Sequence, residues 1–230
     1  MARKISATLF ITLDGVITDP HEWSFPFWND EIAKFKDAEL RRTDALLLGR
    51  TTYETFAAAW PQRKDDTGFA DRFNSLPKFV VSATLNRAAW SGSEIVRPTD
   101  LASLIARLRK EDGGDVMAHG SATLVRSLIR NELLDELRLL VYPLVLGDGK
   151  RLFEGVGDAN FKLVLSQQFS TGVVALIYER GPKIPVEARR AAMKAVLGVY
   201  SKKHERGDAK SAVSRRAADR GPLEGRHVPP

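Results

Sequence analysis

Apolar and polar residues alternate at the start of the chain, from residue 5 to residue 13. The apolar positions are Ile5, Ala7, Leu9, Ile11 and Leu13, and between them lie Ser6, Thr8, Phe10 and Thr12. A period of two residues is typical of a β-strand, whose side chains point to opposite faces in turn. Asp14-Gly15 then predicts the turn that ends the strand. The alternation favours a strand over a secretory signal peptide, which needs a small-residue cleavage site after its apolar stretch.

Helical and strand patterns follow one another over the next part of the chain. Residues 29–42 place apolar side chains among charges, which predicts a short helix. The apolar run 45–48 is unbroken, as in a strand that is buried on both faces of a parallel sheet. Residues 51–54, Thr-Thr-Tyr-Glu, match a capping box, so we expect a helix to begin directly after that strand. Residues 78–82 are a third strand candidate.

The same order of strand, turn and helix recurs further along. Apolar residues at helical spacing predict a helix from Asp100, with Thr99 as its N-cap. Residues 115–118 predict a strand, His119-Gly120 a turn, and residues 121–130 a helix with one apolar side. Strands that alternate with helices are typical of a parallel sheet. The pattern therefore predicts an α/β fold.

The C-terminal end of this pattern is antiparallel. Residues 136–146 are rich in β-forming residues, and two further strand candidates follow at 162–169 and 173–179. Their connection, Ser-Thr-Gly at 170–172, predicts a hairpin. We therefore expect one α/β domain over residues 1–180, with an antiparallel edge.

Charge is distributed unevenly along the 230 residues, whose net charge is +6. Residues 181–230 hold 12 Lys and Arg against 5 Asp and Glu, whereas residues 1–180 hold 23 against 24. The tail has few apolar residues, so we expect it to be helical only within 186–203 and disordered over 207–230. Counterion release could draw such a basic segment to nucleic acid, but only Tyr200 interrupts its charges as a stacking aromatic. We favour a solvated appendage.

The residue patterns of several common metal, nucleophile and phosphate-binding sites are missing from this sequence. Cysteine is absent, and the four histidines are too scattered to indicate a metal site: His21, His119, His204 and His227. No G-x-S-x-G elbow occurs, and the glycines near residues 147–157 have the spacing of neither a P-loop nor a Rossmann turn. No apolar run is long enough to cross a membrane. A cytoplasmic protein without metal is the expectation.

Two glycines stand where a predicted strand passes into a predicted helix, Gly49 before Arg50-Thr51 and Gly120 before Ser121. Each junction would direct free backbone N–H groups and the positive end of a helix dipole to the carboxyl edge of the sheet. Two such junctions on neighbouring strands would suit a ligand with separated phosphates, such as a dinucleotide. Ordinary turn chemistry is the alternative reading.

Five segments of the chain stand in an order that is specific even though each is short. They are Thr12-Leu-Asp-Gly-Val-Ile17, Leu46-Leu-Leu-Gly-Arg-Thr-Thr-Tyr-Glu54, Phe79-Val-Val-Ser82, Gly120-Ser-Ala-Thr-Leu124 and Leu144-Val-Leu-Gly-Asp-Gly-Lys-Arg-Leu-Phe153. Together they resemble the dihydrofolate-reductase-like fold, and in particular the reductase domain of bacterial riboflavin biosynthesis and its standalone relatives. The resemblance runs from about Lys4 to Arg180 and implies a three-layer α/β/α arrangement around a mixed sheet.

The resemblance implies a reductase that takes its hydride from NADPH. In that family an arginine and a serine, here Arg50 and Ser82, meet the adenosine 2′-phosphate. The threonine after the arginine and the second glycine turn hold the pyrophosphate, and the loop after the first strand borders the nicotinamide. Many relatives have a second basic or polar residue after the serine, where this chain has Ala83. The cofactor-binding residues that the family pattern implies here are Gly15, Ile17, Gly49, Arg50, Thr51, Thr52, Ser82, Gly120, Ser121, Ala122 and Thr123.

The substrate side is less specific. The resemblance implies a small heterocyclic substrate, pterin-like or ribosylaminopyrimidine-like, and no zinc deaminase half, since cysteine is absent. Asp14, Asp30 and Glu31 are the candidate catalytic carboxylates, and none of them is singled out. We expect a homodimer, because standalone relatives are commonly dimeric and residues 136–146 hold more apolar side chains than one sheet face needs. A non-catalytic nucleotide-binding module of the same fold is the alternative.

Overall fold

The computed structural model of the chain describes residues 3–196. Contacts within the chain divide it into two units, Met1–Pro182 and Lys183–Pro230. In the second unit residues 186–196 are helical, and their side chains are exposed. The disorder that the sequence predicts for residues 207–230 lies outside the described residues, as does the end of the helix predicted within 186–203.

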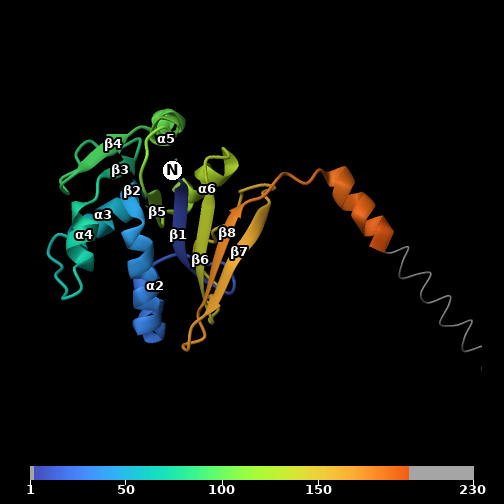
Figure 1. The fold of residues 1–230 in the computed structure, drawn as a ribbon, viewed down its shortest axis with the longest axis horizontal. Helices are drawn as coiled ribbons and strands as arrows, with labels where there is room; N and C mark the ends of the chain where they lie inside the picture. Colours follow the sequence, from blue (N-terminus) through green and yellow to red (C-terminus); the bar gives the residue numbers. More distant parts are fainter. Residues whose placement is uncertain (1–2, 197–230) are drawn as a thin grey trace, which may run out of the picture. The chain divides into compact units, whose positions relative to one another are not determined.

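The first unit is built on one eight-stranded sheet, with the spatial order β4-β3-β2-β5-β1-β6-β8-β7 (Figure 1). The strands from β4 to β6 in this order pair in parallel, β8 pairs antiparallel with β6, and β7 pairs antiparallel with β8. The strands are β1 Ile5–Thr12, β2 Thr43–Gly49, β3 Lys78–Val81, β4 Ser93–Val96, β5 Asp115–His119, β6 Glu136–Tyr142, β7 Phe161–Gln168 and β8 Val174–Arg180.

Helices cover both faces of this sheet, which gives three layers. On one face α5 and α6 pack against the apolar side chains of β1, β2 and β5. On the other face α2, α3 and α4 contribute to two smaller apolar clusters. The helices are α1 Pro20–Trp23, α2 Asp30–Arg41, α3 Arg50–Ala59, α4 Phe69–Ser75, α5 Leu101–Leu108 and α6 Ala122–Arg130, with short 3-10 turns at Phe25–Phe27 and Pro98–Asp100. The α/β fold with a C-terminal antiparallel hairpin is confirmed.

Two predicted helix caps are wrong. Gly49 is the N-cap of α3, and the helix begins at Arg50, so the Thr-Thr-Tyr-Glu string lies inside the first turns and forms no capping box. The string was misleading because β2 runs straight into α3 and leaves no residue for a separate cap. Asp100 is the N-cap of α5, and Thr99 belongs to the 3-10 turn before it. Strand β4 and helix α4 were not predicted, since neither exceeds seven residues.

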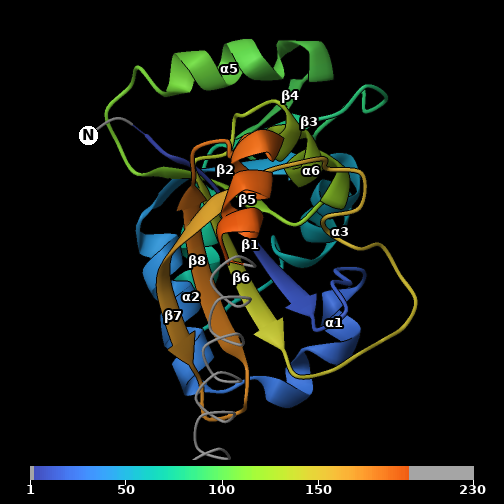
Figure 2. The ribbon, with the colours of Figure 1, turned by 90° about the vertical axis from the view of Figure 1, so that its right-hand side faces the viewer.

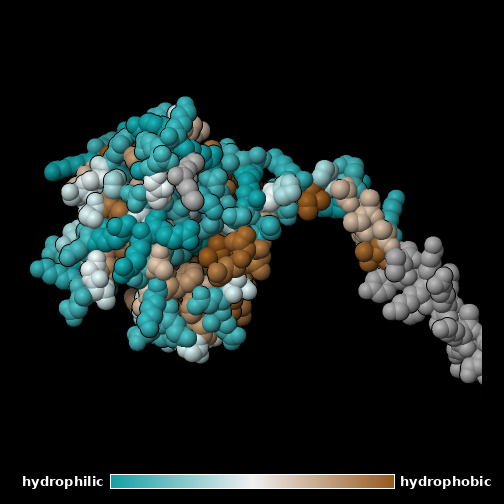
Figure 3. Space-filling view, in the orientation of Figure 1, coloured by the Kyte–Doolittle hydropathy of each residue, from teal (hydrophilic) through white to brown (hydrophobic). Residues whose placement is uncertain are grey.

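The predicted strand at residues 136–146 is shorter than expected, and the dimer argument built on it is wrong. Strand β6 ends at Tyr142 and lies between β1 and β8, so its apolar side chains are used on both faces inside the sheet. Apolar side chains are exposed instead on the edge strand β7 (Figure 3), which lies beside β8 (Figure 2). Its exposed residues Leu163, Val164 and Leu165 have relative exposures of 47%, 45% and 42%.

Candidate functional site

The two strand–glycine–helix junctions lie side by side. Strands β2 and β5 are parallel neighbours, and each passes into a helix at its carboxyl end. Gly49 lies so close to the second junction that a Cβ atom placed on it would be 2.7 Å from the Cβ atom of Ser121. Glycine is therefore required at this position by the close approach of the backbones. The N-termini of α3 and α6 open at the same edge of the sheet.

The two helix starts are capped differently. Helix α3 has no side chain that caps its first turn, whereas Ser121 caps α6 by accepting the N–H of Leu124 at 3.4 Å. Gly120 and Ser121 both have positive φ angles, 61° and 63°, and the Gly120 N–H donates to the carbonyl oxygen of Thr8 at 3.5 Å. Thr51 and Thr123 are exposed, Thr52 is half-buried and Ala122 is buried. The aligned dipoles favour an anion here.

Three neighbouring strand ends place two guanidinium groups beside this edge. Gly49, Val81 and Val96 are partners in the register of β2, β3 and β4, so the residues that follow them are neighbours. The residue that follows Gly49 is Arg50. Its exposed side chain lies 3.9 Å from the carboxylate of Glu54, which makes a weak ion pair. Ser82 follows Val81, and Arg97 follows Val96.

Ser82 and Arg97 are held together by the turn after β3. The Ser82 hydroxyl oxygen accepts the N–H groups of Thr84 at 3.2 Å and Leu85 at 2.9 Å. Arg97 Nη1 donates to the carbonyl oxygens of Ser82 at 3.2 Å and Ala83 at 2.8 Å. Arg97 could not be predicted from the sequence, because the four-residue strand before it has no clear period. Its only signal is the Ile-Val pair that precedes it.

Asp14 fastens the first loop to the segment that follows β6. Its carboxylate accepts the Thr12 hydroxyl at 2.5 Å and the N–H of Gly147 at 2.9 Å, and it lies 3.6 Å from the guanidinium of Arg151. The Thr12 hydroxyl, and after it backbone N–H groups, hold the pKa of Asp14 below its ordinary value. Gly15 turns the loop with a φ of 84°. The carboxylate is thus engaged in contacts within the protein.

The loop continues as a short antiparallel contact with the same segment. Val16 forms a bridge with Arg151, and Ile17 donates its N–H to the carbonyl oxygen of Lys150 at 3.0 Å.

Glu31 is similarly engaged, at the turn of the C-terminal hairpin. Its carboxylate accepts the N–H of Ser170 at 2.8 Å and the side-chain amide of Asn29 at 2.9 Å. It also accepts the Ser170 hydroxyl, and this bond most strongly lowers the pKa of Glu31. Asp30 is exposed in the first turn of α2. Of the three candidate carboxylates, two therefore fix loops.

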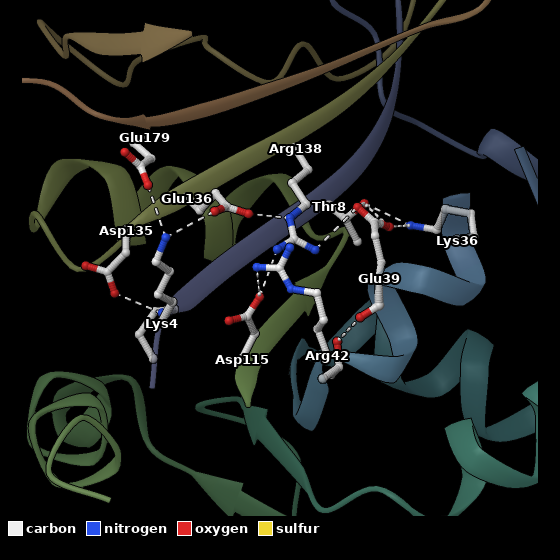
Figure 4. A network of polar contacts seen from close by, with 12 residues as sticks. Lys4, Thr8, Lys36, Glu39, Arg42, Asp115, Asp135, Glu136, Arg138 and Glu179 are labelled. Carbon is white, nitrogen blue, oxygen red and sulfur yellow. Dashed lines mark hydrogen bonds and ion pairs between the residues drawn. The ribbon is translucent and has the colours of Figure 1, made fainter. Parts of the chain in front are cut away.

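A layer of buried charges lies between α2 and the sheet, and the sequence did not reveal it (Figure 4). Arg138 on β6, with 2% of its side chain exposed, bonds to Asp115 at 2.8 Å and to Glu136, and lies 3.7 Å from Glu39 of α2. Lys4 meets Glu136 at 3.5 Å on the outer side of this group. Opposite charges therefore balance within the layer, as buried ions require.

Thr8 on β1 and Lys36 on α2 extend this layer toward the junctions. Lys36 donates to the Thr8 hydroxyl at 2.9 Å and forms an ion pair with Glu39, while the Thr8 hydroxyl donates to Glu39 at 3.2 Å. Thr8 is the register partner of Arg138 on one side and of His119 on the other. Lys36 therefore binds Thr8, which lies directly beside His119, the residue before Gly120.

His119 is held neutral at the end of β5. Burial lowers the pKa of His119 well below its ordinary value, and the charges of Lys36 and Arg138 lower it further. Its ring lies 6.2 Å from that of Phe56 and 5.4 Å from that of Phe73. The imidazole can offer one donor and one acceptor without carrying charge.

The sheet is incompletely covered above Phe10. This residue lies in the middle of the central strand β1, yet it is only half-buried. Trp28, with 41% relative exposure, has its ring 6.3 Å from that of Phe10, and Lys36 Nζ lies 5.7 Å from the centre of the Phe10 ring. Trp23 and Phe27 instead pack edge-on against the buried Tyr142. Phe10, Trp28 and Lys36 therefore lie together at a place where the sheet is only partly covered.

Comparison with known families gives a match over residues 3–175 to the family described as the RibD C-terminal domain. The chain belongs to this family. The residues that carried the sequence resemblance lie within the match, and the suspected family is confirmed. Family membership supports a reductase-like fold. Neither the cofactor nor the substrate of this chain follows from the family alone.

Two relatives are uncharacterized proteins of Bacillus subtilis (strain 168). YyaP is 31% identical over 183 residues, which cover 76% of this chain and 94% of the relative. YwjB is 26% identical over 178 residues, which cover 75% of this chain and 96% of the relative. The similarity thus spans nearly the whole of each relative.

Solved structures confirm the fold. A putative riboflavin biosynthesis protein from Shewanella sp. PV-4 has a TM-score of 0.64 with 21% identity, and the match covers 79% of this chain and all of that one. A dihydrofolate reductase from Enterococcus faecalis complexed with NADP(H) has a TM-score of 0.54 with 15% identity and the same coverage. RibD from Acinetobacter baumannii has a TM-score of 0.54 with 18% identity, over 78% of this chain and 58% of RibD.

Two other structural findings concern residues 3–196. Within this range no helix is long and apolar enough to cross a membrane. Nor do His, Asp and Glu residues of this range gather into a group that could hold a metal ion.

Proposed function

We propose that the chain is an NADPH-dependent reductase that transfers hydride to a small heterocyclic substrate, pterin-like or ribosylaminopyrimidine-like. The observation that carries the proposal is the pair of adjoining junctions at Gly49 and Gly120, with Arg50 beside them. Two helix N-termini at one sheet edge suit a ligand with several phosphates. The family match and the Enterococcus dihydrofolate reductase complexed with NADP(H) support the same reading.

The residues present fit this cofactor. Gly120, the backbone N–H groups of Ser121, Ala122 and Thr123, and the residues Thr51 and Thr52 would surround the pyrophosphate. Gly49 lets the two helix starts approach each other, because a larger residue would collide with Ser121. Gly15 and Ile17 would border the nicotinamide, and NADPH would supply the hydride.

The adenosine 2′-phosphate would lie at the three strand ends. Arg50 is exposed and weakly paired, so it can make charge-assisted hydrogen bonds to a phosphate. In its bonds to Thr84 and Leu85 the Ser82 hydroxyl acts as acceptor, which leaves its O–H to donate. Arg97 adds positive charge beside Ala83, where the sequence pattern pointed to Arg50 alone.

Calorimetric titration of NADPH and NADH into wild type and Arg50→Ala tests this assignment. A charge-assisted hydrogen bond is worth ~1.5–3 kcal/mol, so the variant should lose about 10- to 150-fold in NADPH affinity. NADH affinity should stay almost unchanged. Arg41→Ala removes an exposed arginine that pairs with Asp37 and should change neither. Equal losses for both cofactors in Arg50→Ala would mean that Arg50 holds the pyrophosphate or the fold.

The non-catalytic nucleotide-binding module is the second candidate function. It is favoured by the engagement of Asp14 and Glu31, since both carboxylates already accept several hydrogen bonds from the protein. Oxidation of NADPH, followed at 340 nm with a panel of pterins and pyrimidines, separates the two. Turnover with any substrate supports the reductase, whereas NADPH binding with no turnover across the panel supports the module.

We propose in addition that the chain acts as a cytoplasmic homodimer. The apolar side chains exposed on β7 are the feature of the first unit that supports association, because an uncovered edge strand invites pairing. Light scattering at micromolar concentration should give twice the monomer mass, and Leu165→Lys should reduce it to the monomer. A monomer mass for wild type would remove the dimer from the proposal.

A further inference from the structure

The helix of the second unit, residues 186–196, carries apolar side chains that are exposed. Val186, Met193 and Val196 have relative exposures of 47%, 64% and 54%, and Ile184, just before the helix, has 42%. An amphipathic helix of a folded domain normally turns such side chains toward a core. Several exposed apolar side chains on one short helix therefore indicate a surface for contact.

Charged and apolar residues lie on opposite sides of this helix. At 3.6 residues per turn, Arg190 and Lys194 lie one turn apart on one side. Ala188, Ala192 and Val196 follow one another at the same spacing on the other side. Hydrophobic and hydrophilic residues both appear on the helix in Figure 3. The helix is thus amphipathic.

The charge of the tail has the sign of a segment that binds polyanions. Residues 181–230 hold 12 Lys and Arg against 5 Asp and Glu, whereas residues 1–180 hold 23 against 24. Within the helix, Glu187 is the one acidic residue. Positive charge is therefore concentrated on the same segment of the chain that exposes the apolar side chains.

A lipid surface fits this combination better than nucleic acid does. Nucleic acid would use the cations but not the apolar side of the helix, and of Phe, Trp and Tyr the tail offers only Tyr200 for stacking on bases. The boundary between anionic headgroups and acyl chains accepts both cations and apolar side chains. The composition alone favours a solvated appendage, and the apolar side of the helix is the observation that goes beyond it.

We propose that the helix 186–196 binds the surface of an anionic lipid bilayer. Its apolar side would enter the boundary below the headgroups, while Arg190 and Lys194 would meet the lipid phosphates. Arg189 stands among the apolar residues, and its long side chain can extend to the headgroups. The helix is too short to span a bilayer, so contact is confined to the surface. The proposal is independent of the function proposed above, because the helix lies outside the family match at residues 3–175.

Sedimentation of the full chain with vesicles tests the proposal. Vesicles made of equal parts of phosphatidylcholine and phosphatidylglycerol should carry the protein into the pellet, and vesicles of phosphatidylcholine alone should leave it in solution. Raising the salt concentration from about 0.1 M to about 1 M shortens the Debye length from ~10 Å to ~3 Å and should release most of the bound protein.

Two double variants of the full chain separate the two sides of the helix. Arg190→Gln with Lys194→Gln removes cations, and Met193→Gln with Val196→Gln removes apolar surface. Each should weaken binding to the anionic vesicles by about tenfold or more. The matched control, Lys34→Gln with Arg41→Gln, removes the same charge from exposed positions of α2 and should bind as wild type does.

Three results would overturn the proposal. They are wild type that stays in solution with anionic vesicles at low salt, undiminished vesicle binding by the chain truncated after Pro182, and undiminished binding by the Met193→Gln, Val196→Gln variant. The last result, together with equally tight binding of this variant and wild type to double-stranded DNA, would assign the tail to nucleic acid. All variants of the tail leave the sheet untouched, and a thermal unfolding curve like that of wild type verifies it.

Discussion

The two faces of strand β1 differ in kind, although both are covered by helices. Ile5, Ala7, Leu9 and Ile11 are buried on the face of α5 and α6, inside the largest apolar cluster. Ser6, Thr8 and Thr12 are buried equally well on the face of α2, where charged side chains of four elements meet. The packing on the first face is stabilised by dispersion contacts and the exclusion of water. The packing on the other face depends on hydrogen bonds and ion pairs between specific partners.

This difference separates stability from function within one strand. The apolar face can be satisfied by many combinations of side chains of suitable volume. The polar face holds the half-buried Phe10, and its Thr8 is the register partner of His119, the residue before Gly120. The strand thus fixes the fold with one set of side chains and prepares the candidate site with the other.

Replacement of Arg138 is expected to have the largest effect on this comparison. Arg138→Leu would leave Asp115, Glu136 and Glu39 without their shared cation in a dry environment. Breaking a buried ion pair from one side costs about 3–5 kcal/mol, so urea unfolding at pH 7 should show a loss of that size. Arg42→Leu, which removes a mostly exposed cation 3.8 Å from Asp115, should cost less than about 1 kcal/mol. Similar losses in both variants would show that the polar face does not rely on Arg138.

Crowding at the junctions should give the next largest effect. Gly49→Ala keeps an allowed backbone conformation but forces the new methyl group against Ser121. Overpacking of this kind costs about 1–3 kcal/mol, measurable by urea unfolding. Ser121→Gly removes the obstructing side chain, so the double variant should recover most of the loss. A double variant as unstable as Gly49→Ala would mean that the two junctions are not in contact.

Lys78 differs from the buried cations on the polar face of β1, because backbone carbonyl oxygens and not a carboxylate bind its amine. Its amine donates to the carbonyl oxygens of Asn74, Leu76 and Ser91 at 2.7, 2.7 and 3.0 Å, and burial lowers the pKa of Lys78 to about 8. The unfolded chain keeps this proton up to a pKa of 10.5. Between these values the unfolded state binds more protons, so the free energy of unfolding should rise with pH, by about 1 kcal/mol per pH unit or less.

The control for this pH dependence is Lys78→Met, which removes the titrating group. The difference in unfolding free energy between wild type and variant should shift in favour of wild type from pH 8 to pH 10. A difference that stays constant over this range would show that the lysine keeps its proton in the folded protein.

The smallest effect is expected from the basic tail. Truncation after Pro182 removes the whole of the second unit and no residue that pairs in the sheet, so it should leave both melting temperature and NADPH affinity unchanged. Thermal unfolding and calorimetry of the truncated chain measure the two quantities. A decrease of several degrees in melting temperature would show that the tail stabilises the body.

The sequence predicted those parts of the molecule that depend on local period. The strands at residues 5, 45 and 115, helix α6 and the C-terminal hairpin all carry a clear pattern, and Gly49 and Gly120 stand where strand period changes to helix. The charged layer could not be predicted, because its partners are far apart in the chain: Thr8 and Glu39 are 31 residues apart, and Arg138 and Asp115 are 23 apart.

The same reason applies to the contacts of the candidate carboxylates. Asp14 and Glu31 have the residue type that catalysis needs, and only the folded chain shows that Gly147 and Ser170 occupy them. Arg97 escaped notice for the opposite reason, since nothing in a four-residue strand marks the residue after it. Position in space, not residue type, decides which of these side chains can meet a ligand.

The most direct test of the account is a backbone amide chemical-shift map of the protein titrated with NADPH. We expect the largest shifts at Gly49–Thr52 and Gly120–Thr123, and smaller shifts at Ser82 and Arg97, which follow strands β3 and β4. The amides of β7 and of α5 should not move. Shifts that cluster away from both junctions, or no shift at millimolar NADPH, would contradict the placement of the cofactor at the two glycine turns.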